Sequence, residues 1–101
     1  MKLVLMTYYI GRHDEVMEIL ERLVIRAYTR WREVEGRISR GEPRENSHVW
    51  PGANSALMAV LDEDQAARLI NEIEAFNGRR DGEGIDAYVL DVARTVTAGE
   101  A

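Results

Sequence analysis

The residues best suited to chemistry lie in the stretch 77–84, whose sequence is NGRRDGEG. Glycines let backbone N–H groups approach an anion closely, and arginines can hold phosphate oxygens through paired hydrogen bonds. The stretch therefore predicts a site for a small anion that uses Gly78, Arg79, Arg80, Gly82 and Gly84. A simpler alternative stays open, in which Gly78 ends a helix in the left-handed conformation and Gly82 serves a turn.

A second cationic stretch spans residues 36–53 and includes Gly36, Arg37, Arg40 and Arg44. The chain as a whole carries a formal net charge of −5. A locally basic segment on an acidic protein suits a small anionic ligand better than a polyanion, so nucleic acid is not expected as a partner. The alternative is a solvated flap that binds nothing.

A metal site is a different use of the same segment. His48 and Glu45, with His13 from elsewhere in the chain, would offer an imidazole and carboxylate set to a divalent cation. His13 also suits a surface or helix-capping position, and His48 a structural one. Both interpretations remain open on the sequence alone.

The polar residues show no pattern that is typical of a catalytic site. Ser39, Ser47 and Ser55 have no base at a recognisable spacing, and the chain contains no cysteine. A protein without enzymatic activity is therefore expected. No apolar run approaches the roughly 20 residues that span a bilayer, and the apolar N-terminus predicts a strand and not a signal peptide. A cytoplasmic location is the default expectation.

The periodicity of apolar residues predicts the elements that must position these stretches. Strands are expected at residues 2–10, 27–36, 54–61 and 85–93, and helices at 13–25 and 62–76. Asp62, followed by Gln65, resembles a capping box at the start of the second helix. The order βαββαβ predicts a ferredoxin-like α+β fold in one domain of residues 1–95, with a four-stranded antiparallel sheet, two helices on one face and a frayed tail at 96–101.

Three of the expected strands are apolar at consecutive positions, as in Leu3-Val4-Leu5-Met6. Such runs indicate strands that are buried on both faces. Because the two helices cover only one face of the sheet, a partner subunit is expected to cover the other. Exposed apolar surface is the simpler alternative.

The residues 13–36, which end in Val34-Glu35-Gly36 before the long 36–53 segment, resemble the first helix and second strand of PII-type signal-transduction proteins. The stretch 77–96 resembles the phosphate-binding loop and final strand of that family, with Asp81-Gly82 in place of its Asp-Gly pair. The resemblance covers nearly the whole chain. Arg80 replaces a loop glycine of the family, and Glu83 stands where a phosphate-binding lysine is expected.

Membership of that family would imply a ferredoxin-like homotrimer that binds adenine nucleotides between subunits and docks its long loop onto a transporter or enzyme. It would add Asp81 and Gly36 to the ligand-binding residues. No tyrosine lies between Gly36 and Ala53, so the family's uridylylation switch is not expected. The CutA metal-tolerance proteins share this architecture, and they supply the alternative function, a metal-binding trimer that uses His48.

Overall fold

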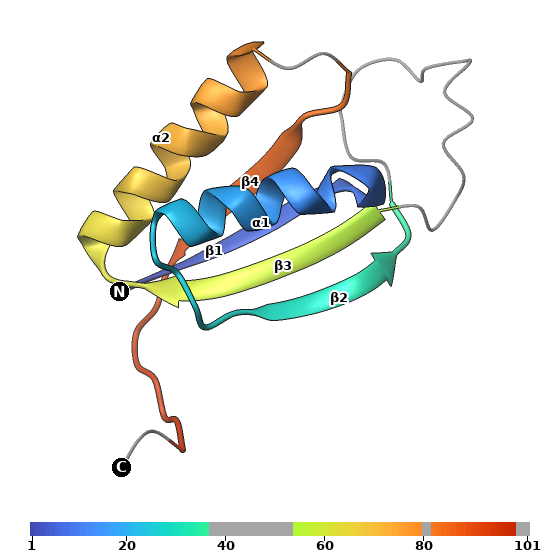
Figure 1. Cartoon of the computed structure of the whole chain (residues 1–101). Helices are drawn as coiled ribbons and strands as arrows, with labels where there is room; N and C mark the ends of the chain where they lie inside the picture. Colours follow the sequence, from blue (N-terminus) through green and yellow to red (C-terminus); the bar gives the residue numbers. More distant parts are fainter. Residues whose placement is uncertain (37–53, 80–81, 99–101) are drawn as a thin grey trace.

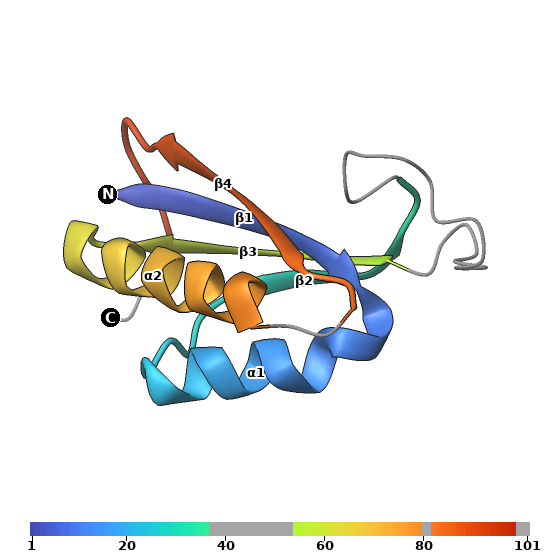
Figure 2. The same cartoon turned by 90° about the horizontal axis from the view of Figure 1, so that it is seen from above.

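The computed structural model describes residues 1–36, 54–79 and 82–98. Four strands form one antiparallel sheet in the order β2-β3-β1-β4, and both helices lie on the same face of it (Figures 1 and 2). The predicted ferredoxin-like fold is confirmed. The elements are β1 (Lys2–Tyr9), a 3-10 turn η1 (Ile10–Arg12), α1 (His13–Arg22), β2 (Thr29–Val34), β3 (Asn54–Leu61), α2 (Glu63–Arg79) and β4 (Ile85–Asp91).

The core lies between the sheet and the two helices. Side chains alternate between the faces of a strand, so every second residue of the central strand β1 points toward the helices. Val4, Met6 and Tyr8 are buried in this way, and the register continues their row into β3 and β4. The helices contribute their apolar stripes to the same core, namely Val16, Ile19, Leu20, Leu69, Ile73 and Phe76.

The opposite face of the sheet is also apolar, as its sequence predicts. Leu3 stands between Val60 and Leu90 in the register, and Leu5 stands between Met58 and Tyr88. On this face Tyr88 is 52% exposed and Leu90 is 50% exposed, so no described segment of the chain covers them. The covering subunit that the sequence predicts stays a prediction.

The first helix ends earlier than its periodicity predicts, at Arg22 and not at Ile25. The Ile25 N–H donates to the Leu20 carbonyl at 2.9 Å and the Val24 N–H donates to the Glu21 carbonyl at 3.1 Å. This pair of bonds forms a Schellman motif, which requires a left-handed residue at the helix end. Val24 takes that position with φ of 59°, although glycine is the usual residue there.

The second helix runs further than predicted, through Asn77 and Gly78 to Arg79. Gly78 is therefore helical, and the interpretation of it as a left-handed helix end is wrong. At the other end of α2 the expected cap is present, because the Gln65 N–H donates to the Asp62 carboxylate at 2.7 Å. The predicted anion-binding stretch thus divides into the last turn of a helix and a short connection to β4.

Candidate functional site

The two predicted binding segments leave the sheet at the same end. Tyr8, near the end of β1, stands opposite Ser55 at the start of β3 and Ile85 at the start of β4. The end of β2 reaches this row too, because Val34 pairs with Asn54. Figure 1 shows the end of β2 and the starts of β3 and β4 at this end of the molecule. The fold therefore gathers the candidate residues at one edge of the domain.

The amide side chain of Asn77 fixes the connection between α2 and β4 at both of its ends. Its Nδ2 donates to the Ile85 carbonyl and its Oδ1 accepts from the Ile85 N–H, both at 2.8 Å. An amide side chain can make this double contact because it carries a donor and an acceptor side by side. The sequence does not predict this role for Asn77, because an asparagine directly before a glycine indicates a break in the helix.

Arg12 is the second residue that the sequence analysis missed. Its Nε donates to the Glu83 carbonyl at 3.1 Å. Its Nη1 lies 3.1 and 3.2 Å from the two carboxylate oxygens of Glu15, and its guanidinium carbon lies 5.6 Å from the centre of the Phe76 ring. One cation thus connects the start of α1, the last turns of α2 and the connection to β4.

The glycines of the predicted stretch occupy different settings. Gly82 has φ of 113°, a conformation that a side chain makes costly, so its use as a turn glycine is supported. Gly84 directly precedes β4. Gly36 closes the other segment at its base, where its carbonyl accepts a hydrogen bond from Asn54 Nδ2 at 2.8 Å.

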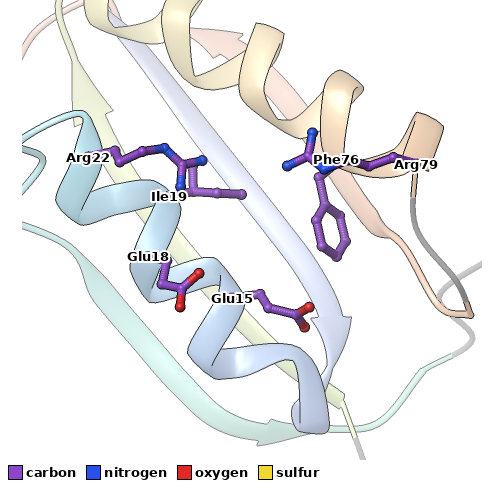
Figure 3. Close-up of a pocket in the computed structure, with 6 residues that line it drawn as sticks. All are labelled: Glu15, Glu18, Ile19, Arg22, Phe76 and Arg79. Atoms are coloured by element: carbon purple, nitrogen blue, oxygen red, sulfur yellow. The ribbon is translucent and has the colours of Figure 1, made fainter.

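Arg79 projects from α2 into a groove between the two helices and not toward the connection to β4 (Figure 3). The groove has a volume of about 130 Å³. The other charged residues that line the groove are Glu15, Glu18 and Arg22, and its apolar lining is formed by Ile19 and Phe76. Arg37, Arg40, Arg80 and Asp81 lie outside the described residues, as do Glu45 and His48.

A buried polar cluster lies on the helix side of the sheet at the same end. The Tyr8 hydroxyl and His13 Nδ1 are joined by a 2.8 Å hydrogen bond, and their rings stack with centroids 6.0 Å apart. Arg30 Nη2 donates to Ser55 Oγ at 3.2 Å, and Ser55 Oγ donates to the Arg32 carbonyl at 2.6 Å. Among the described residues, the buried Arg30 Nε has no hydrogen-bond partner.

The protonation of this cluster follows from its burial. Burial raises the pKa of Tyr8 above its usual value of 10.0, so the hydroxyl keeps its proton. Burial, together with the positive charge of Arg30, lowers the pKa of His13 below 6.5. A neutral histidine and a neutral phenol beside Arg30 leave the cluster with a net positive charge, which favours anions at this end of the sheet.

Metal ligands do not gather within the described parts of the chain. Over residues 1–36, 54–79 and 82–98 no three histidine, aspartate or glutamate side chains form a group that could hold a metal ion. His13 is engaged by Tyr8. None of the helices is long and apolar enough to cross a membrane, as far as the described residues show.

Comparison with known proteins gives matches among solved structures alone. No protein-family model and no curated protein matches the chain. A PII-like signalling protein from Thermus thermophilus is 26% identical, with a TM-score of 0.65 over 90% of this chain and 85% of that one. CPII, a nitrogen regulatory PII-like protein from Thiomonas intermedia in complex with ADP, AMP and bicarbonate, is 15% identical, with a TM-score of 0.61 over 91% and 93% of the two chains.

Proposed function

We propose that the chain is a divergent PII-like protein, a non-enzymatic regulator that binds an adenine nucleotide or a similar anionic metabolite. The observation that carries the proposal is the likeness to a PII-like signalling protein over 90% of the chain at 26% identity. The complex of CPII with ADP, AMP and bicarbonate suggests the class of ligand to test.

The chain's own residues add independent support for an anionic ligand. The connection at residues 82–84 begins at Gly82 with a positive φ, an arrangement that allows successive backbone N–H groups to converge on an anion. Arg30, whose buried Nε has no hydrogen-bond partner in the described parts of the chain, contributes positive charge at the same end of the sheet. We assign the ligand-binding role to Gly36, Arg37, Arg40, Arg80, Asp81, Gly82 and Gly84. Gly78 and Arg79 are left out of this set, because Gly78 lies within α2 and Arg79 projects into the groove between the helices.

We further propose that the ligand binds between the subunits of a homotrimer. The apolar sheet face around Leu5, Tyr88 and Leu90 is the surface that a second copy of the chain would cover. Segment 36–53, whose base is tied to β3 through Gly36 and Asn54, would then signal ligand binding to a protein partner such as a transporter or an enzyme.

Isothermal titration calorimetry with ATP, ADP, AMP, cyclic AMP and bicarbonate tests the ligand proposal. At least one nucleotide should bind, and Arg80→Ala should weaken that binding. Arg68→Ala is the matched control, because Arg68 pairs with Asp64 near the start of α2, at the other end of that helix from the site. If the wild-type protein shows no binding heat with any of these ligands, the nucleotide proposal is refuted.

A further inference from the structure

The Arg12 side chain fills the inner side of the connection between α2 and β4. Only 18% of it is exposed, and it makes its contacts with Glu15, Phe76 and Glu83 in that partly dry setting. Gly82 approaches it closely as well, because a Cβ built on Gly82 would lie 3.0 Å from Arg12 Nη2. The connection therefore wraps around a guanidinium group that is held from the helix side.

The bond from Arg12 to the Glu83 carbonyl sets the direction of the next backbone donor. In a trans peptide the C=O and N–H groups point to opposite sides, and no described peptide bond is cis. Because the Glu83 carbonyl points at Arg12 Nε, the Gly84 N–H points to the side away from Arg12. The inner side is occupied by Arg12, so the outer side is where an anion can reach this N–H.

The charge of Arg12 is already balanced inside the protein. Both carboxylate oxygens of Glu15 lie within hydrogen-bond distance of Nη1, so the pair presents little net charge to a ligand. Glu15 and the Phe76 ring also restrict the guanidinium plane. Arg12 is therefore suited to orient the backbone and not to bind the ligand itself.

We propose that Arg12 is the positioning residue of the candidate anion site, which presents the Gly84 N–H to the ligand by holding the Glu83 carbonyl. The identity of the ligand rests on the function proposed above, whereas the orientation of the 82–84 backbone does not. Hydrogen bonds to charged groups are among the stronger ones in proteins, so Arg12→Gln should weaken nucleotide binding by about tenfold or more.

The test compares Arg12→Gln with Arg22→Gln by NMR on ¹⁵N-labelled protein. Arg22 is the matched control because it also joins the two helices, through a 2.7 Å ion pair with Glu72, but it does not touch the connection to β4. Without ligand, the Glu83 and Gly84 amide resonances should move in Arg12→Gln and stay in place in Arg22→Gln. On addition of ADP, the Gly84 resonance should shift in the wild type at a lower concentration than in Arg12→Gln.

Two further variants separate positioning from charge and from folding. Arg12→Lys keeps the charge but loses the Nε donor, so it should bind ADP as weakly as Arg12→Gln. Full recovery of affinity in Arg12→Lys would overturn the positioning role. If Arg12→Gln does not fold, Glu15→Gln is the substitute, because it removes only the carboxylate that holds the Arg12 guanidinium. It should still move the Glu83 and Gly84 resonances.

The outcomes for the two proposals are distinct. If the wild type binds no nucleotide, the proposed function fails, while the ligand-free spectra still decide the role of Arg12. Unchanged Glu83 and Gly84 resonances in Arg12→Gln would overturn that role, as would wild-type ADP affinity in this variant.

Discussion

Tyr8 and His13 are residues whose protonation depends on burial in the fold. Burial is the largest effect that disfavours imidazolium, and the charge of Arg30 adds to it. Asp14 opposes both, and the charge of Arg32 contributes least. The pKa of His13 is therefore lower in the folded protein than in the unfolded chain. The hydrogen bond to Tyr8 is compatible with the neutral imidazole, whose Nδ1 can accept the phenolic proton.

The lowered pKa of His13 predicts a loss of stability in mild acid. Above pH 6.5, the usual pKa of histidine, both states hold a neutral His13 and its effect is constant. As the pH falls below that value, the unfolded chain takes up a proton that the folded protein resists, so the free energy of unfolding decreases until the folded pKa is passed. Urea unfolding at a series of pH values should show that the free energy of unfolding depends less steeply on pH in His13→Gln than in the wild type. Equal slopes for the two proteins would contradict the prediction.

Val24 is a residue that the fold holds in an unfavourable conformation. Its φ of 59° brings its Cβ close to the following carbonyl, which costs about 1–2 kcal/mol relative to glycine. Its side chain is 58% exposed, so little burial would be lost on truncation. Val24→Gly should raise the free energy of unfolding by about 0.5–1 kcal/mol after the greater freedom of glycine in the unfolded chain is counted.

Urea denaturation measures the effect of Val24→Gly. Val24→Ala is the control, because alanine keeps the Cβ that causes the strain and should gain less. A Val24→Gly protein no more stable than the wild type would show that the left-handed conformation is not strained.

At the scale of elements, the strands and helices were predictable while several of their ends were not. The periodicity of apolar residues located each strand and α-helix of the described residues, because an element that buries one face repeats its apolar residues at the period of that structure. The end of α1 depends on Val24, whose residue type gives no stop signal. The end of α2 depends on Asn77, whose bonds to Ile85 exist only once β4 is in place.

The site residues stay a prediction. Glycines and arginines indicated two connections, and the order of the elements places the described ends of both at one end of the sheet. The role of Arg12 was not predictable, because its partner Glu83 lies 71 residues further along the chain. Only the folded structure brings the two residues into contact. Asn77-Gly78 is a turn signal, so the sequence favours a loop at Gly78 and Arg79, and the tertiary contacts of Asn77 override it.

Asn77 should therefore stabilise the folded protein through its two hydrogen bonds to Ile85. Asn77→Ala removes both bonds to Ile85 and should lower the free energy of unfolding by about 1–3 kcal/mol. Asn71→Ala is the matched control, because Asn71 is exposed on the same helix and alanine is the better helix former. Equal stability of the two variants in urea would mean that the end of α2 does not depend on the amide clamp.

At the scale of the whole molecule, the sheet separates two different apolar surfaces. One is sealed by the helices. The other carries Trp31, Tyr88 and Leu90 with about half of their surfaces exposed. Exposed apolar patches of this kind usually mark contact surfaces in soluble proteins. The proposed homotrimer would bury this face.

Leu90→Glu should break the proposed assembly without unfolding the subunit. The substitution places a charge on the open face, where a partner would have to desolvate it, and leaves the helix-facing core intact. Light scattering after size-exclusion chromatography should change from a trimer to a monomer. Val96→Glu, at an 87% exposed position beyond β4, should remain trimeric. A wild-type monomer, or a trimeric Leu90→Glu, would refute the assembly.

The length of β1 has a practical consequence for finding the protein partner. Because β1 runs along the sheet, Met1 lies at the end opposite to Tyr9 and to the starts of β3 and β4 (Figure 1). The contact of its ammonium group with Glu63 is exposed and contributes little, so an added tag should be tolerated. A biosensor chip that holds the protein by its N-terminus would thus leave the candidate binding end facing the analyte.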